Sequence, residues 1–394
     1  MFKIKILNTI SHAGLNLFPR EEYEVDTDIQ DPDAILVRSH VMHTMSIPDS
    51  VKIIGRAGAG VNNIPVSEFT QRGIPVLNTP GANANAVKEL VIAGMLLASR
   101  NICQASEYVR QLKNLDEKEL DTKIENDKKQ FSGFELMGKT LGVIGLGSIG
   151  VKVANAALGL GMNIIGYDPT ITVGRAWELS SDVKQALSFE HLLRESDFIS
   201  VHVPLNEDTK NLLGAIQFDL MKNNVVILNF SRDGIIDNAM LLQALQEHKV
   251  FSYVSDFPVP HLKDFPRVIS LPHLGASTLQ AEENCALMIV KQVREFLENG
   301  NISHAVNFPN VDMPRATGSI RLSIINENIP NMVAQISSKL AERKINIISL
   351  TNKSKDEMAY TLIDVNNDLD NALLNEMTKI KGIVRVRKIG HFEV

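Results

Sequence analysis

A glycine-rich run at residues 145–150 carries the clearest chemical signal in the sequence. It has the spacing Gly-x-Gly-x-x-Gly, directly follows the apolar run Leu141–Ile144, and opens into a segment with apolar residues at helical spacing. A strand, a glycine turn and a helix in this order let the backbone approach a pyrophosphate closely, and the helix N-terminus stabilises its charge. We therefore expect a dinucleotide here. The expected contacts are Gly145, Gly147, Ser148, Ile149 and Gly150.

An aspartate indicates which dinucleotide fits. Asp168 follows the next apolar run, Asn163–Tyr167, eighteen residues beyond Gly150. A carboxylate at this place accepts hydrogen bonds from the adenosine ribose hydroxyls and would repel a 2′-phosphate. The sequence therefore predicts NAD, rather than NADP, as the cofactor.

Two further reactive side chains follow apolar runs in the same half of the chain. Arg232 follows Val225–Asn229, and His273 follows Val268–Ser270. The carboxyl ends of parallel strands share one edge of a sheet, which is where open α/β sheets bind ligands. A guanidinium can bind a carboxylate through paired hydrogen bonds, and an imidazole can exchange the proton of an alcohol. With NAD, this pair suits hydride transfer at an alcohol carbon.

With these motifs the chain resembles the D-2-hydroxyacid dehydrogenases from end to end, and most closely the members that act on a phosphorylated acid and carry a C-terminal ACT domain. The resemblance implies that Arg232 holds and polarises the substrate, that His273 is the acid/base, and that Asp256 contacts the nicotinamide end of the cofactor. Pro204, after Ser200–Val203, matches the cofactor cleft of the family. The implied reaction is the NAD-dependent oxidation of 3-phospho-D-glycerate to 3-phosphohydroxypyruvate, the entry step to serine.

Segments near the N-terminus resemble those that line the substrate crevice in this family. Arg38 ends one apolar run and can donate hydrogen bonds to a phosphate. For Arg38 and Arg56 alike, a structural ion pair is the alternative. The expected substrate-binding residues are Arg38, Ser39, Arg56 and Asn83.

One segment departs from the family pattern. Members commonly have a glutamate shortly after the position of Asp256, where it pairs with the catalytic histidine, but residues 257–264 contain none. Either Asp264 substitutes for it, or His273 works without a carboxylate partner, or the activity is weak. Our hypothesis is that Asp264 substitutes and joins Arg232 and His273 as a catalytic residue.

The elements that must position these residues follow from the alternation of apolar runs and turns. This alternation predicts an α/β fold with two doubly wound parallel sheets, one Rossmann and one flavodoxin-like, followed by a small βαββαβ fold. A long helix at Thr278–Leu297 would return the chain to the first domain. The expected boundaries are 1–94 with 286–307 for substrate binding, 95–285 for NAD binding, 308–317 for a linker, and 318–394 for the ACT domain.

The C-terminal segment implies regulation. In serine-regulated relatives a turn and the following strand supply polar ligands, which map here onto Asn326, Asn328 and Asn346. L-serine is therefore the expected allosteric effector, although an ordinary turn accounts for the asparagines roughly as well. The family also implies a homodimer or homotetramer that forms through the nucleotide domain.

Composition narrows the class of partner. The net charge of −6 argues against nucleic acid or an anionic membrane as the main partner and leaves a small-molecule substrate. No apolar stretch is long enough to span a bilayer, and two cysteines are too few for a disulfide framework. We therefore expect a cytoplasmic protein.

Two alternatives remain open at the level of sequence. Another D-2-hydroxyacid dehydrogenase is the first, because pocket shape is invisible in sequence. A catalytically weak regulator that binds NAD and an amino acid is the second, and the absent glutamate favours it.

Overall fold

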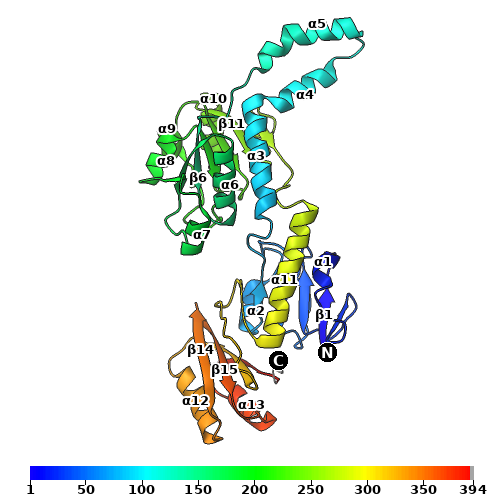
Figure 1. Cartoon of the computed structure of the whole chain (residues 1–394), viewed down its shortest axis with the longest axis vertical. Helices are drawn as coiled ribbons and strands as arrows, with labels where there is room; N and C mark the ends of the chain where they lie inside the picture. The colour runs from blue at the N-terminus through cyan, green and yellow to red at the C-terminus, as the bar shows by residue number, and fades with distance from the viewer. Residues whose placement is uncertain (391–394) are drawn as a thin grey trace. The chain divides into compact units, whose positions relative to one another are not determined.

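The computed structural model describes residues 1–390, which divide into two units by the contacts between their elements. Unit 1 comprises Met1–Ala82 together with the chain from Leu279 onward, and unit 2 comprises Asn83–Thr278. Figure 1 shows the elements of both units along the chain. None of the helices in the described residues is long and apolar enough to cross a membrane.

Unit 2 is built on a parallel sheet whose strands coincide with the apolar runs of the sequence. Its strands are β6 (Thr140–Ile144), β7 (Asn163–Tyr167), β8 (Lys184–Gln185), β9 (Phe198–Val201), β10 (Val225–Asn229), β11 (Val250–Ser255) and β12 (Val268–Ser270). They lie side by side in the order β12-β11-β10-β9-β6-β7-β8. Because β6 and β9 are neighbours while the chain winds outward in both directions from them, this is the doubly wound order that the alternation predicts.

Some helices of unit 2 cover its sheet and others do not. They are α3 (Ala84–Arg100), α4 (Ile102–Gln111), α5 (Glu117–Asp127), the 3-10 turn η1 (Lys128–Phe131), α6 (Ser148–Gly159), α7 (Val173–Glu178), α8 (Phe189–Glu195), α9 (Ala215–Leu220) and α10 (Asn238–Gln246). The helices α3, α6, α8 and α10 pack on the strands, whereas α4 and α5 bury none of their residues. Asn101 adopts a left-handed conformation (φ 50°), which ends α3 and turns the chain into α4. The charged segment beyond α4 forms α5, opened by Asp116 and Glu119 in a capping box.

Unit 1 holds a second, smaller parallel sheet. Its strands are β1 (Phe2–Ile6), β2 (Tyr23–Asp26), β3 (Ala34–Val37), β4 (Ile53–Arg56) and β5 (Val76–Leu77), and its helices are α1 (His12–Leu15), α2 (Val66–Gln71) and α11 (Leu279–Asn299). The order is β2-β1-β3-β4-β5. Gly55 permits the close packing of α11 on this sheet, since a Cβ there would lie 2.8 Å from Ile289 Cγ1 and 2.9 Å from Val293 Cγ2.

The C-terminal part of unit 1 has the βαββαβ order that the sequence predicts. It consists of β13 (Ile320–Glu327), α12 (Met332–Glu342), β14 (Ile347–Lys355), β15 (Met358–Val365), α13 (Asn371–Thr378) and β16 (Ile383–Ile389). The strands form an antiparallel sheet in the order β14-β15-β13-β16. One face packs on α12 and α13 through Ile324, Ile336, Leu340, Ile363 and Met377.

The C-terminal sheet is joined tightly to the end of α11. Consecutive backbone carbonyls at this end accept hydrogen bonds from side chains that follow the helix in sequence: Phe296 and Leu297 from Arg387, Glu298 from Arg315, Asn299 from Arg321, and Gly300 from Tyr360. The last carbonyls of a helix have no partners within it, so these donors complete its C-terminus. Residues 308–317 are likewise fixed, because Phe308, Val311 and Met313 are buried in the core of unit 1.

The boundaries of the units differ from those expected from the sequence. The first 12 residues after Ala82 belong to unit 2, because α3 packs Val87, Val91 and Met95 into the core beneath β6 and β10. The second boundary falls at Leu279, where α11 begins. The C-terminal sheet belongs to unit 1, because Tyr360 and Leu362 share its core.

Candidate active site

The glycine run forms the turn between β6 and α6 in unit 2. Glycine is favoured at each of its three positions for a different physical reason. Gly145 has φ 89°, a backbone conformation that favours glycine. A Cβ at Gly150 would lie 2.0 Å from the Gly145 carbonyl oxygen, so the third glycine permits close packing. A Cβ at Gly147 would meet nothing within 4 Å. Packing within the protein therefore does not require glycine at 147, whereas close approach of a pyrophosphate does.

The first turn of α6 supplies donors for such a ligand. Ser148 and Ile149 begin the helix, and Gly147, its N-cap, provides no side-chain hydrogen bond to the free N–H groups. These groups and the helix dipole favour an anion at this place. The turn therefore fits the dinucleotide that the sequence predicts.

Asp168 lies immediately after β7, beside the glycine turn. Its carboxylate accepts the Leu146 N–H at 2.8 Å through one oxygen, and the N–H and hydroxyl of Thr170 at 2.8 and 3.0 Å through the other. A carboxylate can accept about four hydrogen bonds, so acceptor capacity remains for a ribose hydroxyl. Asp168 also fixes the turn itself, a role that its position in sequence did not reveal.

His202 follows β9 and contacts the glycine turn from the next strand. Its N–H donates to the Ile144 carbonyl at 2.8 Å, and its Nε2 lies 2.8 Å from Ser200 Oγ. Its Nδ1 is buried and has no hydrogen-bond partner in the described structure. Burial lowers the pKa of His202 to about 4, because a charged imidazolium would lose its hydration. The chain then continues to Pro204, whose carbonyl accepts the Thr209 hydroxyl at 2.5 Å.

Arg232 lies beyond the end of β10 and is exposed. Its Nη1 donates to the Ser231 carbonyl at 2.6 Å, and Asn229 Nδ2 binds the Arg232 carbonyl at 2.9 Å. Within residues 1–390 no carboxylate lies within ion-pair distance of this guanidinium. Arg232 is thus held by its backbone, while its charged group remains able to bind an anionic ligand.

His273 lies on the loop after β12, and Asp256 holds that loop in place. The Asp256 carbonyl accepts the His273 N–H at 3.1 Å, and its two carboxylate oxygens accept the Leu274 and Gly275 N–H groups at 2.7 Å each. These bonds stabilise His273 in a left-handed conformation with φ 58°. Asp256 is buried, and the sequence, which suggested a contact with nicotinamide, did not show this supporting role.

The structure does not bring Asp264 to His273. The Asp264 side chain is 82% exposed and pairs with Lys263 at 2.8 Å. Residues 259–265 form a turn that buries Val259 and Leu262, which directs Lys263 and Asp264 toward solvent. Asp264 therefore does not occupy the place of the missing glutamate in this structure.

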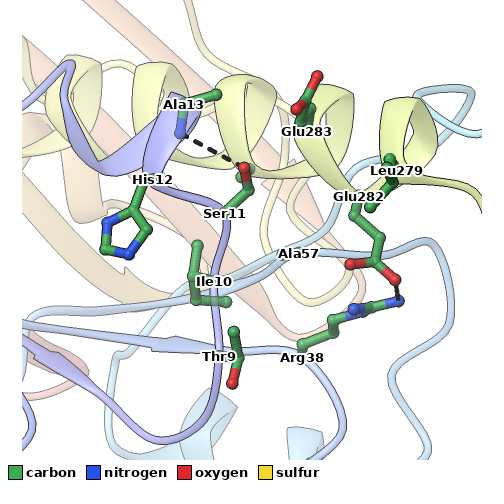
Figure 2. Close-up of a pocket in the computed structure, with 11 residues that line it drawn as sticks. Thr9, Ile10, Ser11, His12, Ala13, Arg38, Ala57, Leu279, Glu282 and Glu283 are labelled. Carbon is green, nitrogen blue, oxygen red and sulfur yellow. Dashed lines mark hydrogen bonds and ion pairs between the residues drawn. The ribbon is translucent and has the colours of Figure 1, made fainter.

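Unit 1 has a cavity of about 300 Å³ that contains Arg38, one of the predicted substrate ligands. Figure 2 shows Arg38 reaching toward Glu282 on α11, with Ser11 and His12 on the opposite wall. Arg38 Nη2 lies 2.7 Å from Glu282 Oε1, and the two side chains are 35% and 38% exposed. An ion pair in contact with water is weak, so an incoming anion can compete with Glu282 for Arg38.

The other predicted substrate ligands of unit 1 surround Arg38. Ser39 Oγ accepts a hydrogen bond from Asn8 Nδ2 at 2.9 Å, and Asn8 Oδ1 accepts the Arg38 N–H at 2.9 Å. Arg56 Nε donates to the Arg38 carbonyl at 3.1 Å. Asn83, by contrast, is the first residue of unit 2 and the N-cap of α3.

Comparisons with known proteins agree with this arrangement. Residues 92–275 match the model of the D-isomer specific 2-hydroxyacid dehydrogenase, NAD binding domain. The chain is 30% identical to the D-3-phosphoglycerate dehydrogenase of Haemophilus influenzae, over 97% of this chain and 93% of that protein. The chain belongs to the D-2-hydroxyacid dehydrogenases. Its fold class, its NAD cofactor and its nature as an oxidoreductase, all predicted from the sequence, are thereby confirmed.

Two further relatives of this D-2-hydroxyacid dehydrogenase have the same name. The D-3-phosphoglycerate dehydrogenase of Methanocaldococcus jannaschii is 35% identical over 88% of this chain, which spans 67% of that protein. The NAD⁺-bound structure of 3-phosphoglycerate dehydrogenase from Entamoeba histolytica is 27% identical, covers 77% of this chain and 98% of its own, and has a TM-score of 0.59.

The three asparagines expected to bind an effector do not lie together in this dehydrogenase. Asn326 pairs with Ala359 across the antiparallel sheet, whereas Ile347, which follows Asn346, pairs with Val365. These two positions on β15 are six residues apart, about 20 Å at ~3.3 Å per residue. Asn328 lies near Asn326, and its Nδ2 donates to the Asp356 carbonyl at 3.1 Å. Within one chain, Asn346 therefore lies far from Asn326 and Asn328.

Proposed function

We propose that the chain oxidises 3-phospho-D-glycerate to 3-phosphohydroxypyruvate with NAD. The observation that carries the proposal is the shared position of four groups at the carboxyl ends of strands in the parallel sheet of unit 2. The glycine turn follows β6, Pro204 follows β9, Arg232 follows β10, and His273 follows β12. This edge is where doubly wound sheets bind their ligands, so the cofactor and the proton-transfer group meet there.

The residues of unit 2 divide the chemistry among them. Arg232 binds the substrate carboxylate through its exposed guanidinium and polarises the adjacent oxygen. The glycine turn after β6 would hold NAD, which when bound would supply the acceptor for the hydride that leaves C2 of the alcohol. His273 removes the hydroxyl proton, so that the O–H bond breaks and an N–H bond forms on the imidazole. In the reverse direction the same imidazolium returns the proton to the carbonyl oxygen.

Three residues of unit 1 are proposed to bind the substrate anion, namely Arg38, Ser39 and Arg56. Support comes from the cavity that holds Arg38, because phosphate requires cationic or N–H donors and Arg38 is partly exposed. Glu282 occupies the guanidinium in the structure, and a phosphate with nearly two charges is the stronger competitor. A phosphorylated acid should therefore displace Glu282 from Arg38 more readily than a simple monocarboxylic acid does.

The test is NADH oxidation, followed by absorbance, with 3-phosphohydroxypyruvate, pyruvate and glyoxylate as competing substrates. The proposal expects kcat/KM to be highest for the phosphorylated acid. A preference for pyruvate or glyoxylate would instead assign the chain to another D-2-hydroxyacid dehydrogenase. No turnover with any of the three would contradict both assignments.

The second candidate is a catalytically weak regulator that binds NAD and an amino acid. The specific observation that favours it is the environment of His273, because within residues 1–390 no carboxylate is paired with its imidazole. Tight NAD binding without turnover would support this candidate. Binding can be followed by energy transfer to NADH from Trp177, the only tryptophan in the sequence, which is 86% exposed.

For regulation, L-serine is proposed to bind the C-terminal sheet, which has the element order of an ACT domain. Asn326 is 1% exposed, and its Oδ1 is buried without a hydrogen-bond partner in the described structure. A buried acceptor of this kind favours a ligand that donates a hydrogen bond. Because Asn346 lies far along the sheet, a site that uses all three asparagines needs two copies of the chain, which suits a homodimer or homotetramer.

Calorimetry with L-serine tests this part of the proposal. The proposal expects L-serine to bind and Asn326→Ala to abolish the binding. Each bound serine should occupy one site, made by Asn326 and Asn328 of one copy and Asn346 of another. No heat of binding at millimolar serine would overturn it. Sedimentation equilibrium measures the oligomeric state independently, and a monomer would contradict a site shared between copies.

A further inference from the structure

The imidazole of His273 packs against the ring of Phe257. The two ring centroids are 5.0 Å apart and the ring planes are inclined at 57°. Within residues 1–390, no ion pair or hydrogen bond joins this imidazole to another side chain. The aromatic contact is therefore the interaction that orients the proton-transfer group.

Phe257 is itself held firmly. Its N–H donates to Ser255 Oγ at 3.0 Å, and it directly follows Asp256, whose carbonyl and carboxylate bind three successive N–H groups of the His273 loop. Gly275 allows this approach, since a Cβ there would lie 3.1 Å from Asp256 Oδ2. One short segment thus fixes both the backbone of His273 and the ring that contacts its side chain.

An aromatic ring does for an imidazole part of what a carboxylate does. It restricts rotation of the imidazole by packing, and its negative face attracts a cation whose centre lies within about 6 Å. In the proposed oxidation, His273 takes the substrate proton and carries a positive charge once it has done so. Attraction that appears with this charge stabilises the transition state more than the ground state, and therefore raises kcat rather than substrate affinity.

We propose that Phe257 is a positioning residue for His273, holding the imidazole and stabilising its protonated form where a carboxylate partner is absent. The proposal rests on the proposed function insofar as His273 transfers the proton. Phe257 does not itself contact the reacting atoms. The contact with Phe257 explains how His273 can transfer a proton although Asp264 faces solvent.

The test compares Phe257→Leu with Phe257→Tyr in the oxidation direction, with NAD and whichever of 3-phospho-D-glycerate, D-lactate and glycolate the wild type oxidises fastest. Phe257→Leu keeps an apolar side chain but loses the ring, and kcat of the oxidation is expected to fall about tenfold, or about 1.4 kcal/mol, with KM for NAD unchanged. Phe257→Tyr restores the ring and is expected to recover most of kcat. Phe251→Leu is the matched control: it removes an aromatic contact with Arg267 elsewhere in the same sheet, and kcat should not change.

The outcomes separate this inference from the proposed function. Substrate preference of the wild type decides the function, whereas the difference between the leucine and tyrosine variants decides the role of Phe257. Equal kcat for wild type and Phe257→Leu would overturn the inference, as would a loss that Phe257→Tyr does not rescue. If the wild type oxidised none of the acids, the His273 Hε1 resonance would decide, because the ring current of Phe257 must shift it and Phe257→Leu must remove that shift.

Discussion

Two arginine–carboxylate pairs at opposite ends of α11 place the same chemical groups in contrasting environments. Arg38 and Glu282 line a cavity and are about one-third exposed, whereas Arg321 and Asp364 are fully buried. Arg321 binds both oxygens of Asp364 at 2.6 and 2.8 Å and also donates to the Asn299, Met313 and Pro314 carbonyls. Arg38 has a single carboxylate contact. The difference teaches that burial and the number of hydrogen bonds decide whether an ion pair is structural or can be exchanged for a ligand.

The largest expected effect lies at the buried pair. Arg321→Met leaves the Asp364 carboxylate buried without a cation and removes the donor to three carbonyls, so the free energy of unfolding should fall by about 3–5 kcal/mol. Urea denaturation followed by circular dichroism measures it. Arg38→Met is the matched control and should change stability by less than about 1 kcal/mol. Equal losses in the two variants would show that burial does not distinguish the two ion pairs.

The exchangeable pair should instead affect substrate binding. Arg38→Met removes charge-assisted hydrogen bonds to the substrate anion, which are worth about 1.5–3 kcal/mol. KM for 3-phosphohydroxypyruvate should therefore rise about tenfold to a hundredfold, while KM for NADH stays the same. Steady-state kinetics with each substrate varied in turn provides the measurement. An unchanged KM for the phosphorylated acid would make the Arg38–Glu282 pair structural as well.

A buried imidazole in unit 2 extends the comparison to a group whose charge depends on pH. The pKa of His202 is about 4 in the folded chain and about 6.5 when unfolded. The unfolded state therefore binds this proton first as pH falls. His202 contributes stability that is complete above about pH 6.5 and is lost toward pH 4, at up to about 1.4 kcal/mol per pH unit. Urea denaturation at pH 7, 6 and 5 should show a shallower loss for His202→Gln than for wild type, and parallel lines would refute the assignment.

The smallest expected effect concerns the acid at the cavity. Glu282→Gln keeps the size of the side chain but removes the charge that competes for Arg38, so KM for the phosphorylated acid should fall about twofold to fivefold. Glu283→Gln, on the same wall of the cavity but without an ion pair to Arg38, is the control. A rise in KM for Glu282→Gln would show that Glu282 orients Arg38 for the substrate rather than competing with it.

Much of the fold could be predicted because apolar runs report directly on buried strands. The runs before the glycine turn, before Arg232 and before His273 became β6, β10 and β12, so the sequence placed these residues at one edge. The edge strands Tyr23–Asp26 and Lys184–Gln185 were missed, because an edge strand needs little apolar surface and the second is two exposed polar residues. Local pattern alone cannot distinguish such segments from loops.

Contacts between distant residues could not be predicted. Arg321 lies in an apolar strand, and its partner Asp364 is 43 residues away, so no local pattern indicates that both are buried. The same holds for Glu282, 244 residues from Arg38, and for Asp256, whose carboxylate holds the loop of His273. The expectation for Asp264 failed for the opposite reason: proximity in sequence suggested a contact, while the buried Val259 and Leu262 turn its side chain outward.

Arg232 is proposed to bind and polarise the substrate, whereas the glycine turn at the same edge of the sheet binds the cofactor without help from Arg232. The most direct test is the kinetics of Arg232→Ala together with NADH binding measured by energy transfer from Trp177. We predict that kcat/KM for 3-phosphohydroxypyruvate falls at least about a thousandfold, or about 4 kcal/mol, while the affinity for NADH is unchanged. Near-normal turnover in Arg232→Ala would contradict the account.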